Sequence, residues 1–283
     1  MLYVYIVAAA AAVPILNNFL PILRQSYSIW LVPAIFLGIF LSLVIIHLLI
    51  FVIAGYCINT KKPIKKASAF YRGLVKLTVP MLFTFTRVKV QSTGLDKTQG
   101  LFPCMLVCNH LNNIDPAVIL KELPDLKLGF IGKKEIYTDM PFVARYMHSL
   151  HCLPIDRENN REAVKTILEA VKLIKDETAS IGIFPEGYIS LDGELKEFRN
   201  GAFKIATKAK CPIVVCTLLG TPEAVKNIFR KRSTVYFDVL EVISAEEVEK
   251  MTTAELSERV HNEMYENIEK RRQETVGQVW VKK

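Results

Sequence analysis

The spacing of apolar side chains divides the 283-residue chain into three parts. Residues 1–60 are almost continuously apolar, and residues 61–86 carry apolar side chains at helical spacing with basic residues between them. Residues 87–283 alternate short apolar runs with amphipathic stretches. A long apolar run is typical of a membrane helix and such alternation is typical of an α/β domain, so we expect a membrane-spanning region followed by one folded domain.

Two stretches of the first part are long enough to form membrane helices. The second, at about 29–57, can cross the ~30 Å hydrocarbon core of a bilayer, and His47 is its only basic or acidic side chain. We expect His47 to be neutral and to face a neighbouring helix. The first stretch, at about 2–23, is interrupted by prolines and asparagines. Because it lacks the basic start and the small-residue cleavage site of a signal peptide, we expect a kinked membrane helix.

The net charge of +8 is concentrated beside this membrane region. Residues 61–86 contribute +6, whereas residues 1–60 and residues 87–283 contribute +1 each. A basic segment next to a spanning helix is expected on the cytoplasmic side, so we predict an integral protein of the cytoplasmic membrane whose domain lies on the cytoplasmic face. The same distribution argues against binding to nucleic acid, which would need a basic surface on the domain itself.

The basic segment 61–86 has two interpretations. Its apolar residues recur at helical spacing from Ile64 to Met81, with the basic residues mainly between them. Such an amphipathic helix suits the headgroup plane of a membrane, where it is held by apolar burial and by attraction to anionic lipid. The alternative is an ordinary surface helix that packs on the domain.

Residues 87–283 have the pattern of an α/β domain with a mostly parallel sheet flanked by helices, because predicted strands alternate with predicted helices. The clearest helix is 159–176, in which apolar residues recur every three or four positions. The predicted strands are Met105–Cys108, Leu128–Ile131, Ser180–Phe184, Ile213–Leu218 and Val235–Val242. The predicted helices are 116–122, 141–149, 159–176, 200–209 and about 253–273.

The six cysteines show neither a CxxC pair nor the Cys/His spacing of a metal site. Most of them lie in apolar runs, where a thiol packs as a small hydrophobic side chain. We therefore expect reduced structural thiols, no metal and no cofactor.

The segment CNHLNNIDP, residues 108–116, holds the first candidate catalytic group. His110 follows a predicted strand, at the carboxyl end where open α/β sheets bind ligands, and it can take a proton from a hydroxyl. Asp115 can orient that imidazole and stabilise the imidazolium. Asp115 followed by Pro116 is also a favoured helix start, so the segment alone supports both a catalytic and a capping interpretation.

Three further segments carry candidate binding residues, each with a structural alternative. Glu186 and Gly187 follow a predicted strand and form either a ligand-binding strand end or a plain turn with a solvated carboxylate. Arg157 either contacts an anion or belongs to a surface ion pair of little energetic value. Arg199 and Lys204 either bind an anion or are exposed charges.

Four motifs in this order resemble those of the PlsC-type 1-acyl-sn-glycerol-3-phosphate (lysophosphatidate) acyltransferases. The family carries Asn-His-x4-Asp, a segment ending in Asp-Arg, Phe-Pro-Glu-Gly, and an apolar segment around a proline. In this chain they are Asn109-His110…Asp115, Ile155-Asp156-Arg157, Phe184-Pro185-Glu186-Gly187 and Cys211-Pro212-Ile213-Val214, within roughly residues 90–220. One departure is Tyr188-Ile189-Ser190 in place of the usual Thr-Arg-Ser. The arginine that the family assigns to the acceptor phosphate is missing there.

The resemblance implies an acyltransferase domain over residues 87–283 that acts on a lysophospholipid acceptor in the membrane. A fatty acyl group would move from a thioester donor, acyl-CoA or acyl carrier protein, to the sn-2 hydroxyl of lysophosphatidic acid, giving phosphatidic acid for phospholipid biosynthesis. The alternatives are another acceptor, such as glycerol 3-phosphate or a lyso-aminolipid, and a non-catalytic membrane-tethered lipid-binding protein.

The resemblance also implies roles for individual residues. His110 would deprotonate the acceptor hydroxyl while Asp115 holds its tautomer. Glu186 would either bind the acceptor headgroup or hold the site together. The substrate-binding residues would be Asn109, Arg157, Glu186, Gly187, Arg199 and Lys204, of which Arg157, Arg199 or Lys204 would have to meet the phosphate.

Overall fold

A computed structural model describes residues 2–19, 28–62 and 68–275 of the chain. These residues form two compact units, Met1–Ile58 and Asn59–Lys283. The end of the first predicted membrane helix, residues 20–23, and the start of the predicted interfacial helix, residues 63–67, lie outside the described residues.

The first unit consists of two helices, α1 (Leu2–Phe19) and α2 (Ser28–Cys57), which pack against each other. The stretch Leu31–Cys57 has a mean hydropathy of 3.0 over its most apolar part and is long and apolar enough to cross a membrane. His47 faces the neighbouring helix as expected, with its ring centroid 6.0 Å from that of Tyr5. Both predicted helices of this region are therefore confirmed as helices, and their insertion in a membrane stays a prediction.

Helix α3 (Ala69–Phe85) belongs to the second unit, where it packs against α4, α6 and β1. The guanidinium of Arg72 donates to the carbonyl oxygens of Leu128 and Leu150, both at 3.2 Å, and burial lowers its pKa to about 10. Lys76 pairs with a carboxylate on the domain surface. The domain's own carbonyl groups therefore bind the charge of Arg72, and the placement of this segment in the headgroup plane of a membrane stays a prediction.

The second unit contains a seven-stranded sheet with the strand order β1-β7-β6-β2-β5-β3-β4. All neighbouring strands are parallel except β6 and β7, which are antiparallel. The strands are β1 (Val88–Thr93), β2 (Met105–Cys108), β3 (Leu128–Lys133), β4 (Leu153–Ile155), β5 (Ser180–Ile183), β6 (Ile213–Leu219) and β7 (Ser233–Ile243). This is the mostly parallel α/β architecture expected from the sequence.

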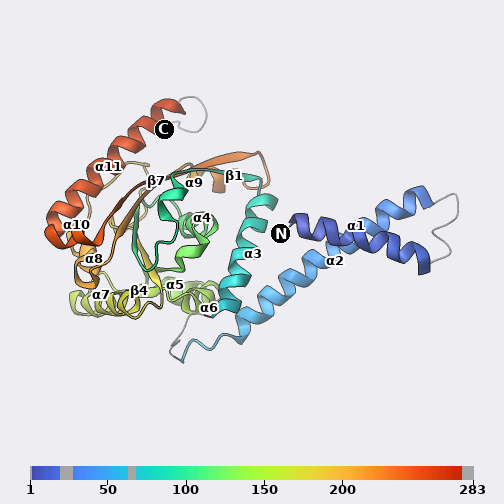
Figure 1. Ribbon diagram of the computed structural model, residues 1–283, viewed down its shortest axis with the longest axis horizontal. Coiled ribbons are helices and arrows are strands. Elements are labelled where there is room, and N and C mark those ends of the chain that lie inside the picture. The colour runs from blue at the N-terminus through green and yellow to red at the C-terminus, as the bar shows by residue number, and fades with distance from the viewer. Residues whose placement is uncertain (1, 20–27, 63–67, 276–283) are drawn as a thin grey trace. The chain divides into compact units, whose positions relative to one another are not determined.

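Helices cover both faces of the sheet (Figure 1). One face is covered by α7, α8, α10 and α11, which close a large buried cluster of the domain, and α3, α4 and α6 lie on the other side. The remaining bounds are α4 (Asp115–Glu122), α5 (Ile136–Asp139), α6 (Pro141–Ser149), α7 (Asn160–Lys175), α8 (Lys204–Ala209), α9 (Thr221–Lys226), α10 (Ala245–Lys250) and α11 (Thr253–Glu274). Short 3-10 turns lie at Leu95–Thr98, Pro124–Leu126 and Asn200–Phe203.

The sequence predictions for regular elements are largely confirmed. The five predicted strands are β2, β3, β5, β6 and β7, and four of the five predicted helices are α4, α6, α7 and α11. The fifth, 200–209, is divided into a 3-10 turn followed by α8. The strands β1 and β4 and the short helices α5, α9 and α10 were not predicted.

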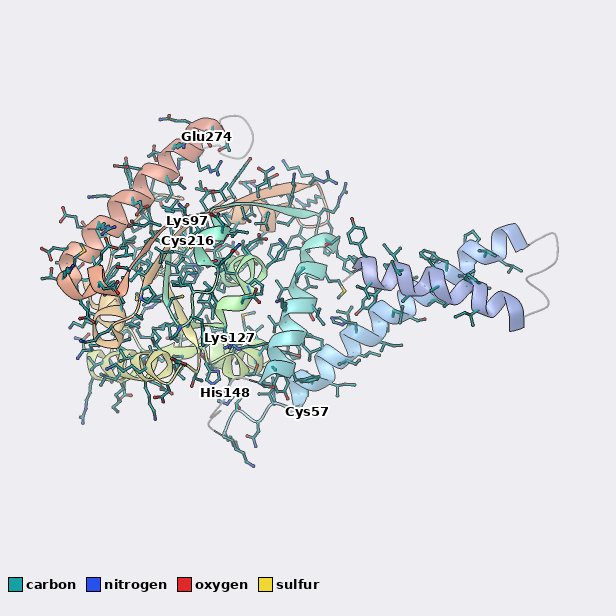
Figure 2. All side chains as sticks on the ribbon, viewed as in Figure 1. Cys57, Lys97, Lys127, His148, Cys216 and Glu274 are labelled. Carbon is teal, nitrogen blue, oxygen red and sulfur yellow. The ribbon has the colours of Figure 1, made fainter. Side chains whose placement is uncertain are left out.

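Five of the six cysteines are buried and none is bonded to another. Cys108 and Cys216 are cross-strand neighbours on β2 and β6, and Cys216 lies inside the domain in Figure 2. Burial raises the pKa of both thiols well above its ordinary value. These thiols are structural side chains of the core, as their apolar sequence surroundings indicate.

Candidate active site

The candidate site begins where β2 ends, because His110 lies two residues beyond Cys108. The His110 Nδ1 atom is 2.9 Å from Asp115 Oδ2. The same carboxylate oxygen accepts the backbone N–H groups of Leu111 at 2.7 Å and of Asn112 at 2.8 Å. Asp115 therefore holds the loop and the imidazole together at the first residue of α4.

Burial strengthens this contact. The side chain of Asp115 is 0% exposed and that of His110 is 14% exposed. A buried carboxylate that accepts Nδ1–H fixes the imidazole tautomer and leaves Nε2 as the nitrogen that can take a proton. Asp115 is the first residue of α4, after Ile114 at the N-cap, and its carboxylate accepts N–H groups of the preceding loop and none of the helix. The predicted helix start is therefore confirmed, the N-cap interpretation is wrong, and the contact with His110 fits the orienting interpretation.

Glu186 braces the same loop from the neighbouring strand. Since β5 pairs with β2 in parallel, the loop after β5 lies beside the loop that holds His110. Glu186 is 1% exposed, and its two carboxylate oxygens accept the backbone N–H of His110 at 2.8 Å and of Lys196 at 3.1 Å. Burial raises the pKa of Glu186 to about 7, although the two backbone donors lower it. The carboxylate thus connects two loops through their main chains.

Two further contacts fix the position of the imidazole and its loop. The ring of Phe184 stacks on that of His110, with centroids 4.1 Å apart and an interplanar angle of 16°. Asn109 pairs with the main chain of β6, donating to Leu218 O at 2.9 Å and accepting from Leu218 N at 2.7 Å. The carboxamide of Asn109 is therefore occupied by β6 and holds the loop to the sheet, while its predicted contact with substrate stays a prediction.

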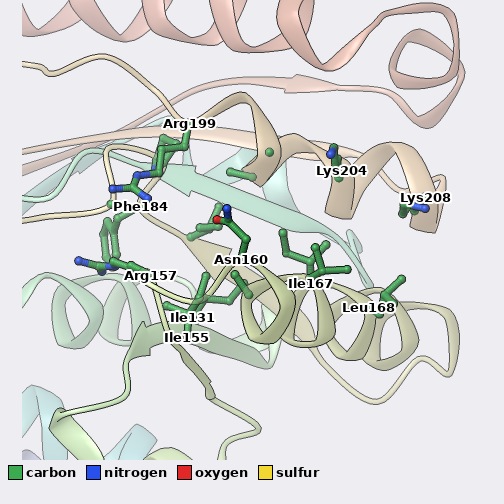
Figure 3. A pocket seen from close by; sticks show the side chains of 17 residues that line it. Ile131, Ile155, Arg157, Asn160, Ile167, Leu168, Phe184, Arg199, Lys204 and Lys208 are labelled. Atoms are coloured by element: carbon green, nitrogen blue, oxygen red, sulfur yellow. The ribbon is translucent and has the colours of Figure 1, made fainter.

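A pocket of about 580 Å³ lies beside this loop and is lined by Phe184, the residue that stacks on His110. Figure 3 shows Arg157 and Arg199 at the Phe184 end of the pocket, and Lys204 and Lys208 at the other end. The wall between these ends is mostly apolar. It is formed by Ile131, Ile155, Ala163, Val164, Ile167, Leu168, Ile183 and Ala202.

The two arginines of the pocket influence each other electrostatically. Burial lowers the pKa of Arg157, and the positive charge of Arg199 lowers it further. Two guanidinium groups held near each other without an acid among the lining residues form a site that favours an anion. The pocket can therefore take a molecule with an anionic group at one end and an apolar portion along its length.

Gly187 determines how Arg199 enters the pocket. Its φ of +82° is a left-handed conformation, and a Cβ atom at this position would lie 2.8 Å from Arg199 Nε. Glycine both permits the turn and leaves room for the guanidinium. The two residues that replace the family's Thr-Arg differ in exposure, since Tyr188 is 49% exposed and Ile189 is half-buried. The next residue, Ser190, is buried and donates its backbone N–H to the carbonyl oxygen of His110.

The structure brings the predicted residues together in two groups. His110, Asp115, Asn109 and Glu186 form the buried loop network, and the other four line the pocket. Those four are Arg157, Gly187, Arg199 and Lys204. Sequence reasoning missed Phe184 as the link between the groups, although Phe184 belongs to the Phe-Pro-Glu-Gly motif. It also missed Lys208, although its position one helical turn after Lys204 made it detectable from the spacing.

Residues 89–219 match the sequence model of the Acyltransferase family. A protein of Mycoplasma genitalium named "Probable 1-acyl-sn-glycerol-3-phosphate acyltransferase" is 34% identical over 147 residues, which cover 50% of this chain and 53% of that protein. A chloroplastic 1-acyl-sn-glycerol-3-phosphate acyltransferase of Brassica napus is 36% identical over 154 residues, covering 54% of this chain and 43% of that protein. The chain thus spans about half the length of the curated relatives it matches.

A crystal structure of the 1-acyl-sn-glycerophosphate (LPA) acyltransferase PlsC from Thermotoga maritima has a similar fold, with a TM-score of 0.61. The match covers 82% of this chain and 94% of that chain at 20% sequence identity, so it bears on the fold. Residues 89–219 are thus similar to the Acyltransferase family, and the curated proteins that match this part of the chain are named 1-acyl-sn-glycerol-3-phosphate acyltransferases.

Proposed function

We propose that this protein transfers a fatty acyl group from a thioester donor to the sn-2 hydroxyl of lysophosphatidic acid, giving phosphatidic acid. The observation that carries the proposal is the contact between His110 Nδ1 and the fully buried Asp115 carboxylate, next to a pocket with two arginines. The names of the relatives support the same substrate class.

In the proposed mechanism, His110 Nε2 takes the proton of the sn-2 hydroxyl as the acceptor oxygen attacks the thioester carbonyl carbon. Asp115 stabilises the imidazolium that forms. The tetrahedral intermediate collapses, the carbon–sulfur bond breaks, and the leaving thiolate takes the proton from the imidazolium. General-base assistance of this kind accelerates a reaction about 10²–10⁴-fold.

Glu186 is a positioning residue in this proposal. Both of its oxygens accept backbone N–H groups, one of them that of His110, and the side chain is 1% exposed. A carboxylate engaged in this way is unsuited to bind a headgroup and well suited to hold the base in place. We therefore assign the headgroup phosphate to Arg157 and Arg199, which line the pocket.

The apolar wall of the pocket suits an acyl chain, and Lys204 and Lys208 at its other end suit a second anionic group. Acyl-CoA carries phosphates on its donor moiety, and acyl carrier protein carries a phosphodiester on its prosthetic group, so both donors fit this end. We propose a membrane location for the enzyme, with α2 as a spanning helix and the domain on the cytoplasmic face, because the stretch Leu31–Cys57 is apolar enough to span and basic residues follow it.

A second acceptor class has one observation in its favour. Tyr188-Ile189 replaces the Thr-Arg of the family motif, so the arginine that meets the phosphate in relatives is missing at that place. Glycerol 3-phosphate or a lyso-aminolipid is then the alternative acceptor.

An acyl-transfer assay separates the proposals. The purified full chain would be given a thioester donor with lysophosphatidic acid, glycerol 3-phosphate or a lyso-aminolipid, and the lipid products would be resolved. Phosphatidic acid as the main product supports the proposed function. Preference for another acceptor would replace it, and absence of product with all acceptors and both donors would favour a lipid-binding role.

A further inference from the structure

The turn between β6 and β7 exposes an aromatic side chain beside three consecutive basic residues. Phe229 is 73% exposed, and Arg230, Lys231 and Arg232 are exposed as well. Among the residues that the structure describes, the side chains of these three cations have no ion pair. The chain from residue 213 to residue 237 contains a single acidic residue, Glu223. We name residues 229–232 the basic turn.

The basic turn lies at the same edge of the sheet as His110. Strands β2 and β6 are parallel, so the loop after Cys108 and the segment after Leu219 leave the sheet at one edge. Leu111 of the His110 loop shares a buried cluster with Leu219 and with Tyr236 of β7. Residues 220–232, which include α9 and then the basic turn, connect the end of β6 to the start of β7. The basic turn therefore leaves the sheet at the same edge as the loop that carries the catalytic candidate.

The end of α3 enlarges this surface. Val88 of β1 pairs with Ser233 of β7, and the carbonyl of Arg87 accepts the N–H of Ser233 at 3.3 Å. Arg87 is exposed, and the last turn of α3 just before it exposes Phe85 at 42%. Figure 1 shows α3 leading into β1 at this border of the sheet. Two aromatic rings and four cations thus gather at the start of β1 and β7.

A phenylalanine gains nothing from exposure to water, and Phe229 also adopts a left-handed φ of 62°, which bulky residues disfavour. Both costs are offset if the ring enters an apolar environment outside the domain. Interfacial membrane binding combines aromatic insertion with attraction between basic side chains and anionic headgroups. Each basic residue near such a surface strengthens binding by roughly fivefold.

We propose that the basic turn, with Phe85 and Arg87, is a docking surface for an anionic bilayer and brings the His110 edge of the domain to the membrane. The proposal goes beyond acyl transfer itself, and it rests on the proposed function only where activity is the readout. An acidic carrier protein is the competing occupant of a basic surface. Two exposed aromatic rings favour the membrane over a partner recognised by charge alone.

The direct test measures contact with lipid and does not depend on catalysis. The full-length variant Phe229→Trp would be reconstituted in vesicles containing about 30% phosphatidylglycerol and brominated acyl chains. The matched control is Tyr265→Trp, at a position of α11 that is 50% exposed. We expect the brominated chains to quench the fluorescence of the Phe229→Trp variant more strongly than that of the parent or of the Tyr265→Trp control. Equal fluorescence changes in the two variants would overturn the proposal.

The second test measures the effect of charge. The triple variant Arg230→Gln, Lys231→Gln, Arg232→Gln is compared with Lys172→Gln, Lys175→Gln, Lys250→Gln. The control removes the same charge from exposed residues near the ends of α7 and α10. Each of the three basic residues strengthens binding to anionic vesicles by roughly fivefold, so the first triple variant should bind such vesicles on the order of a hundredfold more weakly than the parent.

We expect the first triple to lose kcat/KM for the acceptor in anionic vesicles and to keep the parental value in neutral detergent micelles. The control triple should keep the parental value in both. A loss that is as large in micelles, or that occurs with acyl carrier protein and not with acyl-CoA, would overturn membrane docking and assign the surface to the protein donor. If the parent shows no acyl transfer, the quenching result still decides the docking proposal.

Discussion

The substitution Asp115→Asn separates the orienting role of Asp115 from its structural role. One carboxylate oxygen accepts hydrogen bonds from His110 Nδ1 and from the backbone N–H groups of Leu111 and Asn112. An asparagine oxygen can occupy the same place and accept the same bonds, so the loop keeps its geometry. What is lost is the negative charge that stabilises the imidazolium. The expected loss of kcat is that of the general-base contribution, about 10²–10⁴-fold, or roughly 3–5 kcal/mol of transition-state stabilisation.

The stability cost of the same substitution should be smaller. Asp115 Oδ1 is buried without a hydrogen-bond partner, so the amide NH₂ would occupy a site without an acceptor. An unsatisfied buried donor costs about 1–3 kcal/mol. Asp115→Ala would instead leave two backbone N–H groups without their acceptor, so it should destabilise the domain more. Thermal unfolding in detergent would distinguish the two variants.

The assay for Asp115→Asn is a double-mutant cycle with His110→Ala, using acyl transfer to lysophosphatidic acid. If Asp115 acts through His110, Asp115→Asn should cause no further loss in the His110→Ala background. A further loss of about 10²-fold in that background would refute the assignment, because Asp115 would then act independently of the imidazole.

Four other predictions follow from the site. Gly187→Ala should destabilise the protein by about 1–2 kcal/mol and raise the acceptor KM, since its Cβ would lie 2.8 Å from Arg199 Nε; unfolding and steady-state kinetics check this. Arg157→Gln should raise the KM for a phosphate-bearing acceptor about tenfold with kcat little changed, and an unchanged KM would argue against the anion site. Asn109→Ala should lower the free energy of unfolding by about 2–4 kcal/mol because it leaves a buried N–H and C=O of β6 unpaired, as measured by denaturant unfolding. Glu186 has a pKa raised from 4.5 to about 7 in the folded protein, so the native state binds the proton more tightly than the unfolded state does. The free energy of unfolding of the parent, relative to that of Glu186→Gln, should therefore fall by up to about 3 kcal/mol as the pH rises through this range. A difference between the two proteins that does not change with pH would contradict the burial argument.

Most of the fold could be predicted because its central strands are short apolar runs. Met105–Cys108 and Ile213–Leu219 are buried along their whole length, as expected for strands covered on both faces. The edge strands were missed for physical reasons. The strand Val88–Thr93 contains polar residues and has one buried position, Val88, after which exposed and half-buried positions alternate, and Leu153–Ile155 has only three residues. Such strands form because a neighbouring strand pairs with them.

The residue types of the site could be predicted, whereas several of their partners could not. The spacing of His110 and Asp115 suggested their contact, because a loop of this length returns to the start of the next helix. The contacts of Asn109 with Leu218 and of Glu186 with the backbone of His110 depend on which strands are neighbours, and the sequence alone does not determine the strand order. The contact of Arg72 with carbonyl groups of the domain was also not predicted. Periodicity gives the helix face on which a residue lies, and it does not give the groups on the surface that this face meets.

The most direct test of the central claim is the rate of acyl transfer to lysophosphatidic acid by the His110→Ala variant. The full chain would be purified in detergent, and its folding compared with the parent by thermal unfolding. The account predicts that the parent forms phosphatidic acid and that the folded variant is slower by at least about 10²-fold. A folded variant that forms phosphatidic acid within a few-fold of the parental rate would contradict the claim that His110 is the general base.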